Sequence, residues 1–362
     1  MIKALVFDVD GVLVDSEDIS ISVGIKFFRK LGHSLSRKDF EPHLGTGERT
    51  FLSGPADDNG IVFDYDEASR FFKEEYLDEI NGRDLALPGA KRLIALAKEC
   101  GLMVAIASSA PAWKVEANVM AIGFAPSDFD AFITGADIKR NKPEPDIYQM
   151  ALIKLGCSPG EAIVFEDSAG GITSSSKAGI RTVALETTID RSAGLAAGAI
   201  LTLPDLSAVP SFSSGEELES ALFTKEEVVA SYRERLFQAA RKAISNSYSP
   251  YSSFPTSAAI LSFHSLRVYT GVNVENASYP VTICAERNAL FSAVASEGSA
   301  FSLGAILLMT KTSDVGVPCG MCLQALSEFA TPDSPVYLAT FDGKIEEVPF
   351  SSLFPNPFRL DK

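Results

Sequence analysis

Three cysteines and a glutamate near the C-terminus have the types and spacing needed to hold and use a metal ion. Cys284 stands two residues before Glu286, and Cys319 and Cys322 form a Cys-x-x-Cys pair. Three thiolates can hold Zn²⁺ and leave a fourth position open for water, whose pKa the metal lowers toward neutrality. Glu286 is too close in sequence to Cys284 to be a comfortable fourth ligand, but it is well placed to move a proton. We therefore expect a zinc site that activates water.

The alternative for the same residues is a structural zinc site, which usually has four protein ligands. The sequence after residue 224 offers no further cysteine, and its one histidine, His264, is expected at a strand end. A catalytic site is therefore favoured. Arg287, next to Glu286, is expected to offset part of the negative charge that three thiolates bring to the metal.

A second set of reactive residues lies at the N-terminus, where Asp8 and Asp10 follow the apolar run 4–7. An aspartate can attack phosphorus and form an aspartyl-phosphate, which divides one hard step into two. A second carboxylate two residues on can protonate the leaving group and later activate water. Phosphoryl transfer also needs its charge neutralised, usually by Mg²⁺ on carboxylates and by a lysine.

Further candidates for this chemistry follow later apolar runs. Ser108 follows 102–107, Lys142 lies in a Lys-Pro-Glu-Pro sequence, and Glu166 and Asp167 end the run that begins at 162. Ligands of open α/β sheets bind beyond the carboxyl ends of the strands. We therefore expect these side chains to converge with Asp8 and Asp10.

The elements that must position these residues follow an α/β pattern. Residues 1–205 alternate short apolar runs with segments of helical length, which predicts a parallel sheet. Residues 16–84 interrupt this rhythm with a helical pattern, a natural position for a lid. The expected strands are 4–7, 102–107, 132–134, 162–165 and 182–184, and the expected helices include 90–100 and 145–155.

Pro204, Pro210 and the Ser-rich run 211–215 favour a linker over residues 206–224. The segment 225–362 is predicted to be a separate α/β/α domain. Its expected elements are a helix over 226–246, helices that begin near Cys284 and Cys319, and strands over 258–263, 267–274, 305–309 and 336–340.

Composition and charge limit the partners. The chain has 362 residues and a net charge of −15, and from Thr224 onward 11 basic residues nearly balance 13 acidic ones. The acidic excess therefore lies in the N-terminal part, which argues against broad nucleic-acid binding and favours small-molecule substrates. No apolar run approaches the roughly 20 residues of a membrane helix. With no targeting pattern at the N-terminus, a cytoplasmic location is expected.

The N-terminal motifs resemble those of the haloacid dehalogenase (HAD) superfamily over about 1–205. The match includes Asp8-Val9-Asp10-Gly11, Ser108, Lys142 and Glu166-Asp167-Ser168-Ala169-Gly170-Gly171. It implies a Rossmann-like parallel sheet, with 16–84 as the helical cap of the phosphoglucomutase-like branch. Mutases of that branch carry a histidine in the first cap helix; Asp18-Ile19-Ser20 stands there instead, which favours a phosphatase. The implied roles are Asp8 as nucleophile, Asp10 as general acid/base, and Ser108 and Lys142 as phosphate binders. The implied Mg²⁺ ligands are Asp8, Asp167 and Asp10 through its backbone carbonyl, with Glu166 as a supporting residue.

Residues 226–362 resemble the small homotetrameric cytidine deaminases. The resemblance rests on both cysteine motifs, the Tyr248-to-Phe254 string, the Gly271-to-Pro280 string and the Leu353-to-Phe358 string. It implies that Asn273 and Glu275 bind the ribose, that Phe254 and Phe358 flank the pyrimidine, and that Glu286 and the Ala285 backbone hold the polar edge of the ring. Ala277, Tyr279 and Phe358 would reach a neighbour's site, which implies a homo-oligomer, a tetramer or a dimer, formed through this domain.

The sequence departs from the deaminase pattern at two points. Leu323 stands where an arginine is common, so Arg287 is expected to balance the thiolates alone, and Thr256-Ser257 replaces a common Val-Gly. Neither change removes a predicted ligand or Glu286, so deaminase activity is expected.

The whole chain is thus expected to join deamination of cytidine or deoxycytidine to a Mg²⁺-dependent phosphatase acting on a small phosphate ester. CMP or dCMP is a candidate ester, because dephosphorylation followed by deamination would form one route of pyrimidine salvage. An unrelated phosphate substrate, a non-catalytic interaction role for the N-terminal domain and a nucleoside-sensing role for the C-terminal one are the alternatives.

Overall fold

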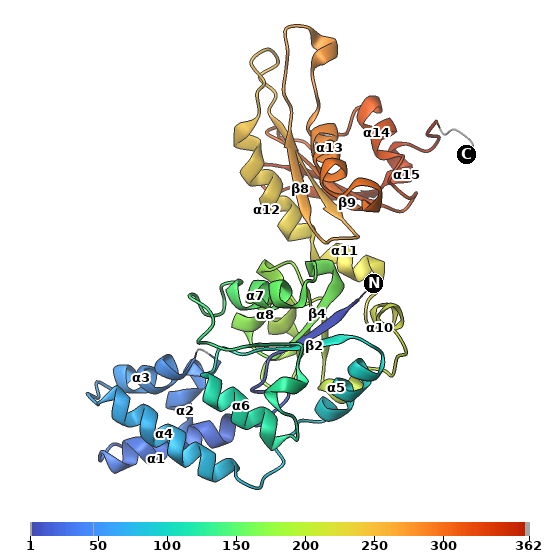
Figure 1. Cartoon of the computed structure of the whole chain (residues 1–362). Coiled ribbons are helices and arrows are strands. Elements are labelled where there is room, and N and C mark those ends of the chain that lie inside the picture. The colour runs from blue at the N-terminus through green and yellow to red at the C-terminus, as the bar shows by residue number, and fades with distance from the viewer. Residues whose placement is uncertain (1, 46, 359–362) are drawn as a thin grey trace. The chain divides into compact units, whose positions relative to one another are not determined.

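The computed structural model describes residues 2–45 and 47–358. The chain divides between Thr224 and Lys225 into two compact units, here called unit 1 and unit 2 (Figure 1). Among the described residues, no helix combines the length and the apolar character that crossing a membrane requires.

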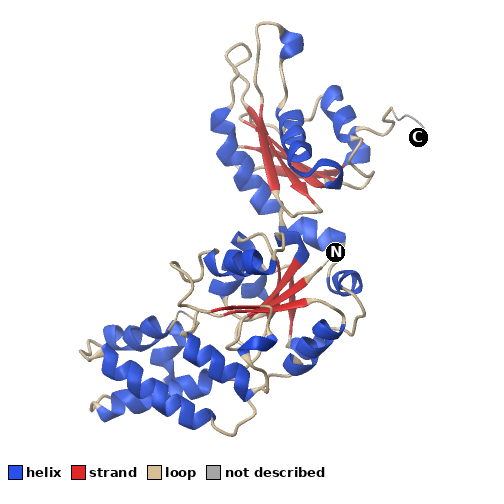
Figure 2. Cartoon of the chain, in the orientation of Figure 1, coloured by secondary structure: helices blue, strands red, loops and turns tan. Residues whose placement is uncertain are grey.

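Unit 1 is built on a six-stranded, wholly parallel sheet in the order β3-β2-β1-β4-β5-β6. Its strands are apolar and buried, as parallel strands covered on both faces should be. Figure 2 shows helices on both faces of this sheet. The strands are β1 (Ala4–Phe7), β2 (Met103–Ala107), β3 (Ala131–Ile133), β4 (Ala162–Glu166), β5 (Arg181–Leu185) and β6 (Leu201–Leu203).

Outside the cap, helices α5 to α9 lie between successive strands in the manner of βαβ units, and α10 follows β6. Tyr148 and Ile147 of one of them pack in a single buried cluster with Ala4 and Val6 of β1. The helices are α5 (Ala90–Glu99), α6 (Ala112–Ala121), α7 (Asp146–Leu155), α8 (Ala169–Lys177), α9 (Arg191–Ala197) and α10 (Gly215–Leu222).

A helical cap is inserted between β1 and α5, as the sequence predicts. It comprises α1 (Glu17–Lys30), α2 (Arg37–Phe40), the short helix η1 (Glu41–His43), α3 (Glu48–Asp58) and α4 (Tyr65–Ile80). Its interior is aromatic. Each ring of the series Phe28, Phe40, Phe51 and Phe72 contacts the next, with centroid distances of 5.3 to 6.1 Å.

The cap contacts the rest of unit 1 through α4 and α6. Trp113 of α6 packs edge-on against Phe72 and Tyr76 of α4, with centroid distances of 6.3 and 5.8 Å. Tyr76 also donates a hydrogen bond of 2.6 Å to Asn118 of α6. The cap is therefore fixed to the sheet-bearing core by a buried aromatic and polar contact.

Residues 206–224 differ from the linker that the sequence favours, because they fold onto unit 1. Leu206 and Leu218 are fully buried, and α10 lies within this segment. Glu219 of α10 forms an ion pair of 2.8 Å with Arg181, whose side chain is 2% exposed. The prolines and serines suggested a flexible segment. Apolar residues spaced along it, such as Leu206 and Leu218, are instead buried against unit 1, which favours an ordered segment.

Unit 2 has a five-stranded mixed sheet in the order β11-β10-β9-β7-β8. Only β9 and β10 are parallel; the other neighbours are antiparallel. Within β7, Ser257 donates a hydrogen bond to Ala240 of α12, whereas Ala258 belongs to the cluster formed with α13 and α14. Successive residues therefore face opposite helical layers, as in an α/β/α sandwich.

The elements of unit 2 are α11 (Lys225–Ser231), α12 (Arg233–Ala243), β7 (Thr256–Ser262), β8 (Val268–Val272), α13 (Ala285–Glu297), β9 (Leu303–Thr310), α14 (Gly320–Leu326), β10 (Pro335–Thr340), β11 (Ile345–Pro349) and α15 (Phe350–Leu353). The single helix expected over 226–246 is divided in two at Tyr232. The predicted α/β fold class of both parts is confirmed, while β6 and β11 were not predicted.

Candidate functional sites

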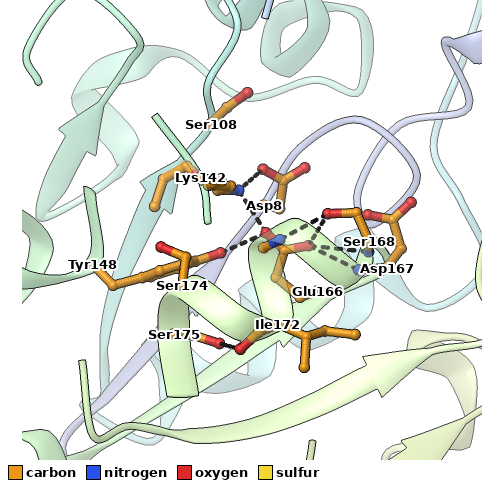
Figure 3. A network of polar contacts seen from close by, with 12 residues as sticks. Asp8, Ser108, Lys142, Tyr148, Glu166, Asp167, Ser168, Ile172, Ser174 and Ser175 are labelled. Atoms are coloured by element: carbon orange, nitrogen blue, oxygen red, sulfur yellow. Dashed lines mark hydrogen bonds and ion pairs between the residues drawn. The ribbon is translucent and has the colours of Figure 1, made fainter. Parts of the chain in front are cut away.

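The first site centres on Lys142, which joins two carboxylates at the carboxyl ends of neighbouring strands. Its Nζ lies 2.5 Å from Asp8 Oδ1 and 2.5 Å from Glu166 Oε1, and it donates to the carbonyl of Ala107 at 3.1 Å. Asp8 follows β1, Glu166 ends β4, and these strands are paired in the sheet. Figure 3 shows the three side chains pointing toward one another. The convergence predicted from the motifs is thus present.

Glu166 is fully buried, and both of its oxygens are occupied. Tyr148 donates to Oε1 at 2.7 Å, while the backbone of Asp167 and both the backbone and hydroxyl of Ser168 donate to Oε2 (Figure 3). A Cβ on Gly171 would lie 1.8 Å from Glu166 Oε1, so only glycine fits there. Glu166 is therefore held rigidly and in turn fixes the Lys142 ammonium beside Asp8.

Asp10 is held by a different group of donors, which come from α6 and from the residue that precedes α1. Its Oδ1 accepts hydrogen bonds from Ser16, from Lys114 at 3.0 Å and from Asn118 at 2.9 Å. Tyr76 of the cap donates to the same Asn118. The orientation of Asp10 therefore depends on α6 and, through Asn118, on the cap.

A cavity opens between the cap and the carboxyl ends of the strands. Asp8, Asp10, Ser108, Lys142 and Asp167 all line it, together with cap residues. Ser108 is 2% exposed and its hydroxyl accepts a hydrogen bond from the Ala110 backbone. The six predicted residues of this site are thus brought to one place; of these, Glu166 alone is not among the lining residues.

The charge balance of the site favours a cation. Burial raises the pKa of Asp8 to about 7 against the opposing effect of Lys142. Burial, with the neighbouring Glu166 carboxylate, also holds the pKa of Asp167 well above its usual range. Buried carboxylates exceed the lysines that can neutralise them, and hard oxygen ligands suit Mg²⁺. The donor set therefore fits a divalent cation near Asp8 and Asp167.

The second site, in unit 2, is a cluster of three thiols. Cys284 is the N-cap of α13 and Cys319 the N-cap of α14, and Cys322 lies one turn into α14. The Cys319 sulfur lies 3.9 Å from that of Cys284 and 3.5 Å from that of Cys322. Two sulfurs that are each bonded to one tetrahedral zinc at about 2.3 Å lie somewhat less than 4 Å apart, which agrees with these distances. The geometry and the soft donors fit Zn²⁺.

Glu286 and Arg287 lie on the first turn of α13 beside the thiols. Burial raises the pKa of Glu286 to about 7, a value suited to proton transfer near neutral pH. Arg287 Nη2 lies 4.0 Å from the Cys284 sulfur and donates to the Thr282 carbonyl at 3.2 Å. Leu323, in contrast, is buried in the core of the unit, so the position after Cys322 supplies no charge.

Asn273 and Glu275 organise the loop that precedes β7. Asn273 Oδ1 accepts from the Ser247 hydroxyl at 2.5 Å and from the Thr256 backbone at 2.9 Å, and its Nδ2 donates to the Phe254 carbonyl at 2.9 Å. Glu275 accepts from the hydroxyl and backbone of Ser252. Both side chains are buried, and they fix the backbone on either side of Phe254.

The remaining predicted contact residues of unit 2 do not form an enclosed site within one chain. Phe254, Tyr279 and Phe358 are 43%, 71% and 67% exposed, and Ala277 is exposed too. Phe358 nevertheless contacts α14, the helix that carries Cys322. Its backbone N–H and carbonyl form two hydrogen bonds with the side-chain amide of Gln324. Ala285 is buried at the start of α13.

Several residues of both sites were missed by sequence reasoning. Lys114, Asn118 and Tyr76 belong to no motif, and only the fold brings them to Asp10. Tyr148 lies six residues after Lys142, and the first turn of α7 carries it back to Glu166. Gln324 directly follows Leu323, yet nothing in its spacing pointed to Phe358.

Each unit matches one family model. The family model described as "Haloacid dehalogenase-like hydrolase" matches residues 5–185, and that described as "Cytidine and deoxycytidylate deaminase zinc-binding region" matches residues 230–338. A cytidine deaminase of Sporosarcina psychrophila is 39% identical over 125 residues, which cover 34% of this chain and 90% of that protein.

Two further proteins match unit 1. The crystal structure of CbbY from Rhodobacter sphaeroides in complex with phosphate has 26% identity and a TM-score of 0.54, and covers 60% of this chain and 100% of its own. The Arabidopsis thaliana protein SUPPRESSOR OF QUENCHING 1, chloroplastic, is 38% identical over 191 residues, 52% of this chain. The match covers only 18% of that larger protein.

Proposed function

Because the chain belongs to the haloacid dehalogenase-like hydrolases through unit 1 and to the cytidine deaminases through unit 2, we propose that unit 2 converts cytidine or deoxycytidine to uridine or deoxyuridine by zinc-dependent hydrolysis. The observation that carries this proposal is the convergence of three thiols with the buried Glu286 at the start of α13.

In this proposal Cys284, Cys319 and Cys322 hold Zn²⁺, which when bound supplies an activated water. Glu286 then moves a proton from that water to the ring nitrogen and later to the departing ammonia. Arg287 offsets part of the thiolate charge. Asn273 and Glu275 bind the ribose, and the Ala285 backbone holds the polar edge of the pyrimidine.

The exposed aromatic residues support a homo-oligomer. Phe254, Tyr279 and Phe358, with Tyr251 at 51% exposure, present large apolar surfaces to solvent on one chain. Such surfaces mark interaction sites. We propose that copies of unit 2 associate as a tetramer or a dimer, and that Ala277, Tyr279 and Phe358 complete a neighbour's pyrimidine site. Measuring the mass of the protein in solution, with and without Tyr279→Ala, tests this directly.

For unit 1 we propose a Mg²⁺-dependent phosphatase of a small phosphate ester. Asp8 attacks the phosphorus and forms an aspartyl-phosphate, while Asp10 protonates the leaving oxygen and then takes a proton from the attacking water. Ser108 and Lys142 bind the phosphoryl oxygens. Asp8, the backbone carbonyl of Asp10 and Asp167 would hold the cation, which when bound neutralises phosphate charge.

CMP or dCMP is the ester that would join the two activities into one pyrimidine salvage route. The argument for it is that both units lie on one chain. If the ester is unrelated to pyrimidines, or if unit 1 serves only as an interaction module, the deaminase proposal is unaffected.

One experiment separates these possibilities. The purified chain is incubated with CMP and Mg²⁺ while phosphate, cytidine and uridine are followed by chromatography, with cytidine alone as a parallel substrate. A salvage route gives phosphate and uridine from CMP; Asp8→Asn abolishes both but spares cytidine deamination, and Glu286→Gln stops at cytidine. Deamination of cytidine with CMP untouched would refute CMP as the ester and leave the deaminase proposal intact.

A further inference from the structure

The last described residues of unit 2 form a short segment whose backbone has little freedom to rotate. This segment, here called the C-terminal arm, is Phe354-Pro355-Asn356-Pro357-Phe358 and follows α15. Each proline fixes its own φ angle and restricts the residue before it to extended conformations. The arm is therefore stiff up to Phe358, which alone escapes both restrictions.

The C-terminal arm is anchored in the core of unit 2 at its first residue. The Phe354 backbone N–H donates to the Phe350 carbonyl at 3.0 Å, and the two rings lie edge to face with centroids 6.4 Å apart. Phe350 is buried in the cluster that also contains Leu323 and Leu326 of α14. The first residue of the arm is therefore fixed relative to α14.

Gln324 of α14 holds the other end of the arm. Its Nε2 donates to the Phe358 carbonyl at 2.9 Å, and its Oε1 accepts from the Phe358 N–H at 3.2 Å. In the described part of the chain, residues 355–358 make no hydrogen bond other than these two. The position of Phe358 therefore depends on one side-chain amide.

The orientation of this amide is itself fixed by Ser327. The Ser327 hydroxyl donates to the main-chain carbonyl of Gln324 at 2.8 Å, so its oxygen serves as an acceptor for Gln324 Nε2 at 3.3 Å. Nε2 therefore faces Ser327 and the Phe358 carbonyl, which leaves Oε1 for the Phe358 N–H. A primary amide can satisfy both backbone groups of one residue in this way.

Gln324 belongs to the helix that carries two of the three thiols, but it does not face them. Cys319 is the N-cap of α14, and Cys322 lies two residues before Gln324. Two residues turn an α-helix by about 200°, so Gln324 lies on the side of α14 away from Cys322. It can hold the arm without touching the zinc site.

The side chain of Phe358 contrasts with its backbone. Both backbone polar groups are held by Gln324, yet the side chain is exposed, at 67% for the residue. A large apolar ring on an ordered backbone suits contact with another molecule, because part of the loss of freedom on binding has already taken place.

We propose that Gln324 is a positioning residue of the deaminase, which holds the Phe358 backbone so that the ring flanks the pyrimidine in the site of a neighbouring copy. This inference rests on the proposed function of unit 2 and on the role proposed there for Phe358. Without the amide, the arm keeps its prolines and its Phe354 anchor, but each substrate that binds has to order the ring. The loss therefore falls on binding and not on the proton transfers at Glu286.

The test is steady-state deamination of cytidine by the full, zinc-loaded chain. Gln324→Leu keeps a side chain of similar size and a good helix former, but it removes both hydrogen bonds. KM should rise about 3- to 30-fold, the value of one or two neutral hydrogen bonds. The change in kcat should stay within about twofold, as expected when an interaction common to the ground state and the transition state is lost.

Two further variants make the result specific to the amide. Gln324→Glu keeps the acceptor for the Phe358 N–H and loses the donor to the carbonyl, so KM should rise by an intermediate factor. Gln238→Leu is the matched control, because the amide of Gln238 on α12 bonds within its own helix, to Glu234 at 2.7 Å. It should leave both constants unchanged, and elemental analysis should find about one Zn²⁺ per chain in all three variants.

A double-variant cycle shows whether Gln324 acts through Phe358. Phe358→Ala should raise KM at least as much as Gln324→Leu does. Adding Gln324→Leu to Phe358→Ala should change KM by less than twofold, since no ring is left to position. Additive effects, loss of zinc in Gln324→Leu, or a fall in kcat at unchanged KM would overturn the inference.

The same measurements separate this inference from the function on which it rests. If the wild type does not deaminate cytidine, the deaminase proposal fails and the role of Gln324 fails with it. If the wild type is active but Phe358→Ala leaves KM unchanged, the deaminase proposal stands and the roles of Phe358 and Gln324 both fail. If Phe358→Ala raises KM and Gln324→Leu does not, the role of Gln324 alone fails.

Discussion

Asn118 donates a hydrogen bond of 2.9 Å to Asp10, and its own side-chain oxygen accepts one of 2.6 Å from Tyr76 of the cap. Asn118 is fully buried, so neither contact is replaced by water when it is lost. The proposed general acid/base is thus connected to the cap through one amide, and the orientation of Asp10 depends on the cap being in place.

Removing the Tyr76 hydroxyl should therefore impair phosphate release. In Tyr76→Phe the aromatic contacts with Trp113 and Phe72 remain, but Asn118 loses its donor, at a cost of about 1–2 kcal/mol. We expect kcat to fall about 3- to 20-fold with little change in KM, and the acidic limb of the kcat profile against pH to move. If kcat falls by this amount while its dependence on pH stays as in the wild type, the result would contradict a positioning role for Tyr76. Tyr65→Phe, on the same helix but hydrogen-bonded to Glu48, is the matched comparison.

Two adjacent glycines of α8 should respond in opposite ways to alanine. A Cβ at Gly171 would stand 1.8 Å from Glu166 Oε1, whereas one at Gly170 meets nothing within 4 Å. Gly171→Ala should displace Glu166 and with it Lys142, so we expect a loss of about 1–3 kcal/mol in the free energy of unfolding and of most phosphatase activity. Gly170→Ala should be neutral or stabilising by up to about 1 kcal/mol. Urea unfolding and phosphate release measure both.

Acid should weaken unit 1 through Glu161. Partial burial opposes the charged form, but hydrogen bonds from Lys3 and Ser158 outweigh it and lower the pKa of Glu161 from 4.5 to about 2. A depressed folded-state pKa means that the stabilisation is complete above about pH 4.5 and is lost as the pH falls toward 2. Because Lys3 is 57% exposed, solvent screening limits the contribution to about 1 kcal/mol or less.

The check on this prediction is a pair of unfolding titrations. Glu161→Gln should lower the free energy of unfolding at pH 7 and make the difference from the wild type shrink as the pH falls below 4.5. A difference that stays constant from pH 7 to pH 3 would show that the carboxylate charge is not responsible.

Each thiol of unit 2 should be needed for metal and for deamination, but not for unit 1. We expect about one Zn²⁺ per chain in the wild type and close to none in Cys284→Ser or Cys322→Ser, measured by elemental analysis, with cytidine deamination lost. Phosphate release by unit 1 should persist in both. Cys100 is a thiol of unit 1 that donates to the Phe212 carbonyl. The control variant Cys100→Ser should keep the zinc and both activities.

The predictable part of the structure is the part that local pattern determines. The buried runs of β1, β2 and β4 read as strands, and the residues that end them, such as Asp8 and Glu166, could be placed at one edge of a sheet before any coordinates were known. The N-cap positions of Cys284 and Cys319 were predictable in the same way. The chemical roles of these residues remain predictions.

What sequence could not show depends on contacts between distant segments. Lys114 and Asn118 reach Asp10 over more than 100 residues of chain, and no spacing rule relates them. The fold of 206–224 was misjudged for a related reason, since Arg181, which anchors Glu219, lies on β5 and could not be assigned as its partner. The edge strands β6 and β11 are poorly buried, since only the middle residue of β6 and none of β11 is buried. Neither therefore has the continuous apolar run that marks β1 and β4.

The contact between Trp113 and the cap has a practical consequence for observing the protein. Trp113 is the one tryptophan among the 362 residues, and it packs against Phe72 and Tyr76. Indole fluorescence excited apart from tyrosine therefore arises from unit 1 alone, at the surface where the cap contacts α6. Unit 2 contributes no indole emission, so the intrinsic fluorescence of the intact chain reports on the contact between the cap and α6 and on the unfolding of unit 1 without an added label.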